Sequence, residues 1–275
     1  MPNFAIHQVD AFTDEVFGGN PAAVVPLTPE DEWLTATTMQ AIAAENALSE
    51  TAFIRPRRGA ARRLWDIRWF TPAVEVDLCG HATLASAHVV LTHLRPADED
   101  VVFVGAAVGE LAVSRAGDRR YRMSLPRRAC EPCQAPPGLF TALGRAPREL
   151  LGGISYVAVY ETQAEVAALE PTMADLMQLD RDGVIATAPA EHGSGVDFVS
   201  RYFVPAAGIP EDPVTGSAHC LLAPLWAGRL GKAELEAAQI SARGGRLSCR
   251  VLDDTVEVGG TCVDYLVGTI QVPRG

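Results

Sequence analysis

Side chains that can exchange protons gather in three short segments of the 275-residue chain. Glu50 enters an otherwise apolar stretch, and a carboxylate removed from water suits general acid–base catalysis near neutral pH. His81 and Ser217 occupy equivalent places, each directly after a glycine, and Asp212 lies in the loop before the second glycine. Each residue alone also fits a structural role, as a solvated strand end or a helix cap. Their concentration beside two matched glycines favours acid–base catalysis at one site.

The two glycines, Gly80 and Gly216, each precede a stretch with the composition of a helix. A helix N-terminus exposes unpaired N–H groups and the positive end of the helix dipole, so it attracts anions. Glycine at that place lets a ligand approach the backbone closely. Two such helix starts that face one cleft predict the binding of a small carboxylate. The alternative is ordinary capping by Thr215 or Ser217, which is compatible with binding.

A repeated hexapeptide indicates that the chain is a duplicated half. Arg-Trp-Phe-Thr-Pro-Ala at 68–73 returns as Arg-Tyr-Phe-Val-Pro-Ala at 201–206, and each copy leads through an acidic loop to a Gly-X-Ala segment. The copies are separated by nearly half the chain, which suits one duplication better than a solenoid of short repeats. Residues 125–137, rich in proline and arginine, are expected to connect the two halves.

The segments after the two glycines, 82–91 and 218–227, carry almost no polar side chains. A helix that is apolar on all sides must be buried, so each half is expected to be a sheet curled around a central helix. Pro224 lies inside the second of these helices and is expected to kink it. Strands are predicted at 4–12, 22–27, 49–54, 64–70, 101–104, 109–113, 154–160, 184–187, 196–203 and within 239–272, and further helices at 30–45 and 164–179.

The composition excludes several classes of function. The formal net charge of −11 argues against a nucleic-acid or anionic-membrane partner, and no apolar run reaches the ~20 residues that span a bilayer. No signal peptide is recognised, so a soluble cytoplasmic protein is expected. Lys232 is the only lysine and lies in a polar stretch, which argues against Schiff-base and pyridoxal-phosphate enzymes. The six histidines lack zinc-binding spacing, and Cys130 and Cys133 have no second cysteine pair, so no metal is expected.

Several motifs of the chain are shared with a known family. They are Val9-Asp10-Ala11-Phe12 with Gly19-Asn20-Pro21, then Leu48-Ser49-Glu50-Thr51, then Phe70-Thr71-Pro72 leading to Cys79-Gly80-His81-Ala82, and Glu211-Asp212-Pro213-Val214-Thr215-Gly216-Ser217-Ala218. On these motifs the chain resembles the PhzF-like (phenazine-biosynthesis isomerase-like) proteins, relatives of diaminopimelate epimerase and proline racemase. The resemblance covers essentially the whole length, and the last motif is highly specific.

The resemblance implies an α/β (α+β) diaminopimelate epimerase-like fold with two pseudo-symmetric halves, each a curled, mostly antiparallel sheet around a buried helix. It places the halves at 1–124 and 125–262, with the active site in the cleft between them and the last strand, 263–273, returning to the first half. The phenazine enzyme shifts a proton within a dihydro-hydroxyanthranilate, with a glutamate as acid/base and no cofactor. A homodimer that binds a small carboxylate substrate is implied as well.

By motif match the acid/base glutamate is Glu50, and His81 and Asp212 complete the expected catalytic set. Glu45, five residues earlier, falls at the polar end of the preceding helix and is not expected to take part. The residues expected to bind substrate are Asn20, Gly80, Gly216 and Ser217.

The chain departs from the cysteine-dependent racemases of the same superfamily. Those enzymes need one cysteine from each half, because inversion requires a base on one face and an acid on the other. Cys79 matches the first position, but no cysteine stands at the second, and Cys220 lies beyond the glycine. A proton-shifting isomerase is therefore expected. Cys79 is interpreted as a remnant, a small buried residue or an accessory residue near the cleft, and His219 as a further accessory residue. The alternatives are a racemase or epimerase that uses Cys79 as one base, and a catalytically silent binder of small acids.

Overall fold

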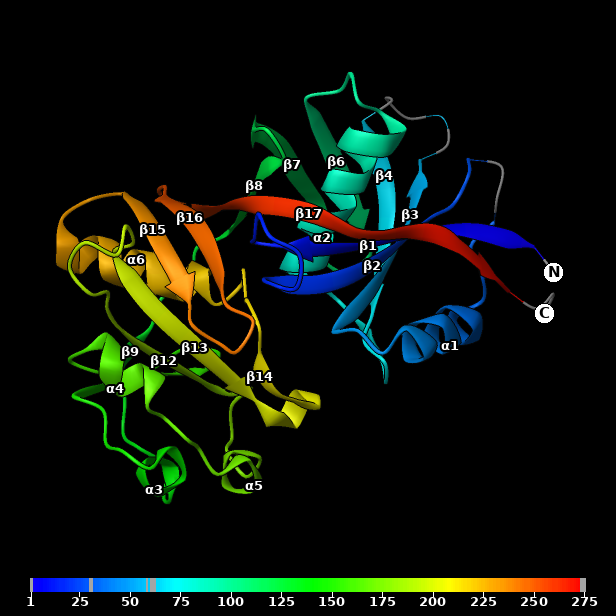
Figure 1. The fold of residues 1–275 in the computed structure, drawn as a ribbon. Helices are drawn as coiled ribbons and strands as arrows, with labels where there is room; N and C mark the ends of the chain where they lie inside the picture. The colour runs from blue at the N-terminus through cyan, green and yellow to red at the C-terminus, as the bar shows by residue number, and fades with distance from the viewer. Residues whose placement is uncertain (1, 30–31, 58, 60–62, 273–275) are drawn as a thin grey trace. The chain divides into compact units, whose positions relative to one another are not determined.

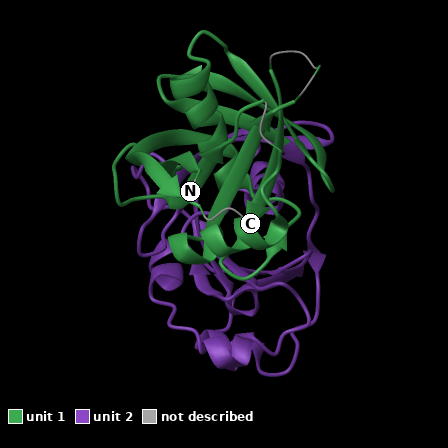
Figure 2. Ribbon diagram, turned by 90° about the vertical axis from the view of Figure 1, so that its right-hand side faces the viewer, with its two compact units in different colours: residues 1–124, 259–275 green, residues 125–258 purple. Residues whose placement is uncertain are grey.

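The computed structural model describes residues 2–29, 32–57, 59 and 63–272, and the chain forms two compact units. Unit 1 contains Met1–Ser124 and Gly259–Gly275, and unit 2 contains Leu125–Val258 (Figure 2). The long last strand β17, Thr255–Gln271, begins in unit 2 and continues into unit 1 (Figure 1). The C-terminal residues are therefore part of the same unit as the N-terminal half of the chain.

Unit 1 is a closed ring of strands. Around the ring, β1 pairs with β2, β2 with β3, β3 with β4, β4 with β6, β6 with β7, β7 with β8, and β17 joins β8 to β1. The β2–β3 and β4–β6 pairs are parallel, and the β1–β17, β1–β2, β3–β4, β6–β7 and β7–β8 pairs are antiparallel. The bounds are β1 Asn3–Ala11, β2 Asn20–Pro26, β3 Glu50–Pro56, β4 Leu64–Phe70, β6 Asp100–Gly105, β7 Gly109–Gly117 and β8 Arg120–Pro126, with a short β5 at Glu75–Val76.

The helix α2, Gly80–Val89, fills the ring of unit 1. Each of its residues from His81 to Val89 is buried, and it packs against β1, β2, β3 and β7. The helix has no polar side, so at the protein surface it would expose apolar side chains to water. Burial inside the ring removes this apolar surface from water. The helix ends in a π-helical turn, η1, Val90–Leu94. A second helix of this unit, α1, Ala36–Asn46, connects the parallel strands β2 and β3 and buries Met39 and Ala43.

Unit 2 repeats the same order of strand pairings. Strand β10 pairs antiparallel with β11, β11 runs parallel to β12, β12 antiparallel to β13, β13 parallel to β15 and β15 antiparallel to β16. The strands are β9 Glu131–Pro132, β10 Glu149–Gly152, β11 Tyr156–Val159, β12 Val184–Pro189, β13 Phe198–Val204, β14 Ile209–Asp212, β15 Glu234–Gln239 and β16 Gly245–Val251. The helices are α3 Leu139–Leu143, α4 Gln163–Ala167, α5 Met173–Leu176, the 3₁₀ turn η2 Pro205–Ala207, and α6 His219–Leu230.

The duplicated hexapeptide makes the same contacts in both units. Arg68 binds Glu75 through two hydrogen bonds of 2.7 Å, and Arg201 binds Glu211 through two of 2.8 Å. In each copy the arginine holds the hairpin that follows, β4–β5 in unit 1 and β13–β14 in unit 2. The guanidinium groups also lie over the aromatic residue two positions later, 5.2 Å from Phe70 and 4.8 Å from Phe203. The two halves are pseudo-symmetric in detail as well as in topology.

Several predicted elements differ from the observed ones. The predicted helix 164–179 is two short helices, α4 and α5, because Pro171 between them cannot donate a helical hydrogen bond. The predicted helix 30–45 begins at Ala36, where Thr35 caps it by accepting a hydrogen bond from the Thr38 N–H; residues 30 and 31 lie outside the described residues. The second central helix begins at His219, after turns at 216–218, and not at Gly216. The predicted connection 125–137 includes the strand β9.

Gly19 shows why the Gly19-Asn20-Pro21 segment begins with glycine. Its φ of +61° lies in the left-handed region, and a Cβ atom there would lie 2.1 Å from the carbonyl oxygen of Ala11. The turn therefore brings β2 back against β1, so that Asn20 pairs with Ala11.

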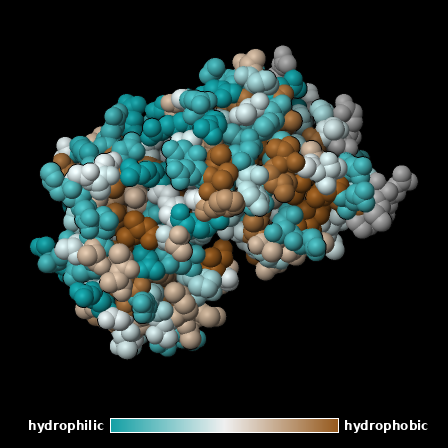
Figure 3. Space-filling view, in the orientation of Figure 1, coloured by the Kyte–Doolittle hydropathy of each residue, from teal (hydrophilic) through white to brown (hydrophobic). Residues whose placement is uncertain are grey.

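The surface face drawn in Figure 3 is mostly hydrophilic, with smaller apolar patches among the polar side chains. Within the part of the chain that the structure describes, no helix has both the length and the apolar composition to cross a membrane.

Candidate active site

Three of the predicted site residues form one cluster in unit 1. Glu50 is the first residue of β3, Cys79 is the N-cap of α2, and His81 is in the first turn of α2. The Glu50 Oε2 atom lies 3.1 Å from His81 Nε2, and the Cys79 Sγ atom lies 3.4 Å from His81 Nδ1. The side chains of Glu50 and His81 are 14% and 6% exposed, so both are largely removed from water.

The ring of strands explains how Glu50 reaches the start of α2. Strands β2 and β3 run parallel with Ala22 opposite Glu50, so their N-terminal ends lie at the same end of the ring. Asn20, the first residue of β2, is fully buried at that end. The side chain of Glu50 contacts His81, which lies in the first turn of α2. The parallel pairing therefore gathers Asn20, Glu50 and the start of α2 at one end of unit 1.

Burial and charge set the protonation states in this cluster. Burial and the nearby charge of Glu50 raise the pKa of the Cys79 thiol to about 11, against smaller lowering effects of His81 and the Ala82 N–H. Burial alone lowers the pKa of His81, but Cys79 and the Glu50 carboxylate together raise it well above its ordinary value. Near pH 7 the thiol is neutral, so the Glu50 carboxylate is the charge beside His81 that favours its protonated form.

The start of α2 offers backbone N–H groups to an anion. The N-cap residue Cys79 makes no capping hydrogen bond with its side chain, and the Thr83 hydroxyl donates to the Cys79 carbonyl at 2.6 Å. The first N–H groups of a helix have no partner within it, and the helix dipole adds positive potential at the same place. Gly80 opens this turn, and His81, whose pKa is raised by Cys79 and Glu50, follows it. The arrangement suits a carboxylate next to a group that can carry a proton.

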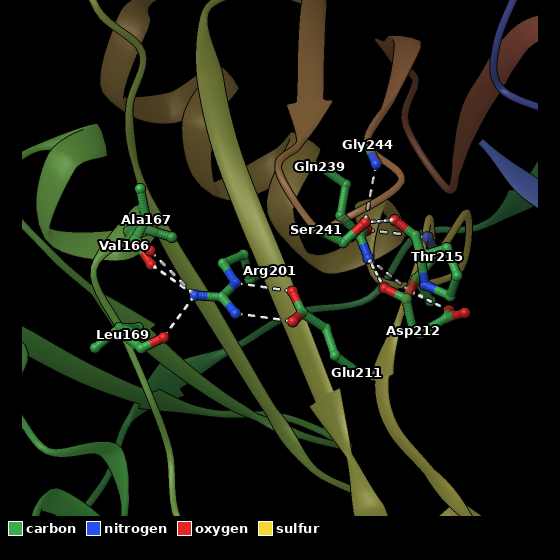
Figure 4. A network of polar contacts seen from close by, with 11 residues as sticks. Val166, Ala167, Leu169, Arg201, Glu211, Asp212, Thr215, Gln239, Ser241 and Gly244 are labelled. Carbon is green, nitrogen blue, oxygen red and sulfur yellow. Dashed lines mark hydrogen bonds and ion pairs between the residues drawn. The ribbon is translucent and has the colours of Figure 1, made fainter. Parts of the chain in front are cut away.

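Of the predicted residues of unit 2, Asp212 lies in a polar network with Thr215, Gln239 and Ser241 (Figure 4). Asp212 ends β14, and its carboxylate accepts a hydrogen bond from the Thr215 hydroxyl. Gln239 donates from Nε2 to the Asp212 carbonyl at 2.7 Å, and its Oε1 accepts from the Thr215 N–H at 2.9 Å. Ser241 donates to the Pro213 carbonyl at 2.6 Å. The loop that carries Asp212 is thus held by side chains from β15 and the turn after it.

Gln239 was missed by the sequence analysis, although a signal was present. It is 1% exposed and shares the inward face of β15 with Leu235 and Ala237, which alternate with exposed Glu234 and Glu236. A polar side chain that continues an inward apolar alternation must have hydrogen-bond partners, because a buried amide without them costs free energy. That reasoning identifies Gln239 as a residue that fixes a buried loop.

Gly216 and Ser217 form the turn before α6. Their carbonyl groups accept hydrogen bonds from the N–H groups of His219 at 3.1 Å and Cys220 at 3.2 Å. Neither Thr215 nor Ser217 caps the helix, whose N-cap is Ala218 without a side-chain hydrogen bond. The binding roles of Gly216 and Ser217, the catalytic role of Asp212 and the cleft between the two halves stay predictions.

His219 is fully buried in unit 2. Its Nδ1 lies 2.8 Å from the Thr215 carbonyl, to which it donates as the neutral imidazole, and its ring lies 5.8 Å from that of Phe198. Burial lowers the pKa of His219 to about 4, against a smaller raising effect of the Thr215 carbonyl. Its accessory role at the site stays a prediction, but its burial has a testable effect on stability.

The exchange His219→Asn is expected to remove a pH dependence of the free energy of unfolding. The unfolded chain binds a proton at His219 below its ordinary pKa of 6.5, whereas the folded chain binds one only near pH 4. Wild-type stability therefore falls as the pH falls through this window, by up to roughly 3 kcal/mol at 1.36 kcal/mol per pKa unit. Asparagine can keep the bond to Thr215 without titrating. Urea unfolding at several pH values compares the two proteins, and equal slopes would contradict the expectation.

Comparison with known proteins agrees with the fold and with the motifs. A family model described as phenazine biosynthesis-like protein (PhzC-PhzF) matches residues 9–133 and 150–268. An uncharacterized isomerase of Pseudomonas aeruginosa is 49% identical over 267 residues, which cover 97% of this chain and 98% of the relative. The homologous human phenazine biosynthesis-like domain-containing protein is 38% identical over 286 residues, which cover 95% and 96% of the two chains.

Comparison with solved structures also finds members of the phenazine biosynthesis-like family. A crystal structure of a PhzF-family phenazine biosynthesis protein from Enterococcus faecalis matches with a TM-score of 0.91 and 41% identity, covering 98% of this chain and 100% of that one. The diaminopimelate epimerase-like fold expected from the sequence is confirmed by this structure and by two solved epimerase structures with a similar fold. With its motifs, its duplicated fold and these matches over nearly its full length, the chain belongs to the phenazine biosynthesis-like (PhzF) family of isomerases and epimerases.

Proposed function

We propose that this chain is a cofactor-independent isomerase that moves a proton between two carbons of a small, unsaturated or cyclic carboxylic acid, with Glu50 as the acid–base group. One observation carries the proposal. The Glu50 carboxylate is 14% exposed and lies 3.1 Å from the His81 ring, in the first turn of α2. A proton carrier thus stands beside an anion-binding helix start, which is what a proton shift next to a carboxylate requires.

In the proposed reaction, Glu50, His81 and the N–H groups of α2 supply the acid–base chemistry and the stabilisation of charge. Glu50 removes a proton from a carbon that is activated by a neighbouring double bond or carboxylate. The C–H electron pair forms a new double bond as the old one shifts, and Glu50 returns the proton to another carbon. The His81 imidazolium and the N–H groups of α2 stabilise the negative charge that develops on the substrate. Protons and electrons balance within the substrate, so neither an oxidant nor a leaving group takes part.

The state of Cys79 argues against a thiol base. A thiolate is the reactive form of cysteine, and the pKa of Cys79 is raised to about 11 by burial and by the charge of Glu50. Near pH 7 the thiol is neutral and contacts His81 through its sulfur. The racemase alternative needs this group as a base, whereas the isomerase leaves it as a packing and hydrogen-bonding residue.

A ligand screen followed by NMR tests the function. Thermal-shift measurements with small cyclic and amino carboxylates select the acids that bind, and ¹H NMR in deuterated water follows each of them with the protein. We expect a C–H signal to disappear as a product with a shifted double bond forms. A bound acid that exchanges no proton at any pH would contradict the isomerase and support the silent acid-binding alternative.

The exchange Cys79→Ser is expected to leave the rate of deuterium incorporation within a few-fold of wild type. Serine keeps a polar group beside His81 but forms no thiolate. Iodoacetamide at neutral pH is likewise expected to leave the wild-type rate unchanged, because the buried thiol is protonated. A loss of activity that follows alkylation of Cys79 would favour the racemase.

The predicted homodimer and cytoplasmic location are tested separately, by light scattering and by fractionation of cells.

A further inference from the structure

A second group of titratable side chains lies at the C-terminal end of α2, the end opposite to His81. It consists of His7 on β1, His88 near the end of α2, His93 in η1 and Asp264 on β17, here called the Asp264 cluster. The Asp264 Oδ2 atom lies 3.2 Å from His88 Nε2 and 2.9 Å from His93 Nε2. One donor atom each of His7, His93 and Asp264 lies within 4.8 Å of the others, and the rings of His7 and His93 are 4.9 Å apart.

The π-helical turn η1 is what aligns two of these histidines. His88 and His93 are five residues apart, and at about 100° per residue a regular α-helix would point them about 140° apart. In η1 the Arg95 N–H donates to the Val90 carbonyl at 2.6 Å, the i→i+5 bond of a π-helix. Side chains five positions apart thus return to one face, where both Nε2 atoms contact the same oxygen of Asp264. Turns of this kind occur frequently at functional sites.

A bulge in the β1–β17 ladder lies beside the same cluster. Val9 pairs with Asp264 and Gln8 pairs with Leu266, so β17 has one extra residue at this point. A bulge turns a side chain out of the regular alternation of a strand, and bulges concentrate next to binding sites. The π turn and this bulge therefore both adjoin the Asp264 cluster.

Tyr121 fixes the orientation of His88 from behind. Its hydroxyl lies 3.1 Å from His88 Nδ1 and 2.9 Å from the Thr92 hydroxyl, and the Tyr121 side chain is fully buried. The His88 ring is thereby fixed with its Nε2 atom 3.2 Å from the Asp264 carboxylate. Outer partners of this kind orient a metal-binding carboxylate.

The cluster leaves buried donor atoms without partners. Among the described residues, the buried His7 Nδ1 and Asp264 Oδ1 atoms make no hydrogen bond.

We propose that the Asp264 cluster binds one divalent transition-metal ion of the zinc type, with His7, His93 and Asp264 as its donors. Two imidazole nitrogens, one carboxylate oxygen and a water molecule suit Zn²⁺ in tetrahedral coordination. With metal–donor bonds of about 2.05 Å, neighbouring donors of a tetrahedron stand about 3.3 Å apart. The observed separation of 2.9 Å between His93 Nε2 and Asp264 Oδ2 is close to that value. The three donors come from β1, η1 and β17, so the ion would tie these elements together.

Titration of the tag-free full chain with Co²⁺ tests the site. We expect one equivalent to bind with the visible bands of tetrahedral cobalt and without a thiolate-to-cobalt charge-transfer band, since the Asp264 cluster contains no cysteine. The distinction matters because, among the described residues, the donor atoms of Glu50, Cys79 and His81 also lie close enough to hold an ion. Zn²⁺ is expected to displace the cobalt and to raise the melting temperature.

Variants assign the signal to its donors. His93→Ala and Asp264→Asn, both at partly exposed positions, are expected to abolish the cobalt bands, and Tyr121→Phe to weaken binding about 10–100-fold. His192→Ala removes an exposed imidazole outside the cluster and, like Cys79→Ser, should leave the bands unchanged. The site is refuted if folded wild type takes up no cobalt, if the bands disappear in Cys79→Ser, or if His93→Ala and Asp264→Asn bind as wild type does.

Discussion

Replacement of Glu50 by glutamine is expected to lower solvent-deuterium incorporation about 10²–10⁴-fold, the range of general acid–base catalysis. Glutamine has nearly the shape of glutamate and can still bond to the His81 ring, which lies 3.1 Å from the carboxylate. It cannot accept and return a proton, however. Binding of the carboxylate ligand, measured by calorimetry with an acid from the screen, should therefore stay within a few-fold of wild type.

The matched control for this variant is Glu45→Gln. Glu45 lies on α1, five residues before Glu50, and its side chain is exposed. The same chemical change there should alter neither binding nor exchange. Undiminished exchange in Glu50→Gln would remove Glu50 from the mechanism. An equal loss of exchange and binding would mean that the carboxylate shapes the site without carrying the proton.

The exchange His81→Gln is expected to lower the rate of deuterium incorporation about 10²-fold, because it removes a positive charge beside the reacting group. The pKa of His81 is held well above its ordinary value, against the effect of burial, by Cys79 and Glu50. Wild-type activity should accordingly fall on the alkaline side as the imidazolium loses its proton. Glutamine does not titrate, so the variant should lack this alkaline limb. A pH–rate profile with the limb unchanged would show that another group is responsible.

The raised pKa of His81 also makes the free energy of unfolding depend on pH. A base whose pKa is higher in the folded than in the unfolded state stabilises the fold fully below its unfolded pKa, here 6.5. That contribution is lost as the pH rises through the folded-state pKa. The stability of wild type relative to His81→Gln should therefore be greatest in mildly acidic solution and should decline in alkaline solution. Urea unfolding at a series of pH values measures the difference, and a decline toward acid would have the wrong sign.

Much of the fold was predictable because its signals are local. The apolar stretch 82–91 predicted a buried helix, and α2 is buried from His81 to Val89 because no face of it is polar. The alternation of Trp65, Ile67 and Trp69 predicted β4, and the repeated hexapeptide predicted the duplication that both arginine–glutamate pairs display. The error at 164–179 had a local cause as well, since Pro171 breaks a periodic pattern that alone indicates one helix.

The site was predictable only in part. The motifs identified Glu50, Cys79 and His81, and the parallel pairing of β2 with β3 accounts for the position of Glu50. The Asp264 cluster had no comparable signal in the sequence. His7 and Asp264 are at opposite ends of the chain and become neighbours only through the β1–β17 ladder. Likewise, spacing rules for helices separate His88 from His93, and only the π turn unites them.

The last strand also sets the order in which this chain can finish folding during synthesis. The ring of unit 1 closes only when β17 lies between β8 and β1, and β17 ends at Gln271 of the 275 residues. The ribosome releases these residues after all of unit 2 has been made. Although domains usually complete folding from the N-terminus onward, here the unit that is synthesised first must wait with two unpaired strand edges. A chaperone that shields those edges would therefore act on the first half of the nascent chain until β17 has been synthesised.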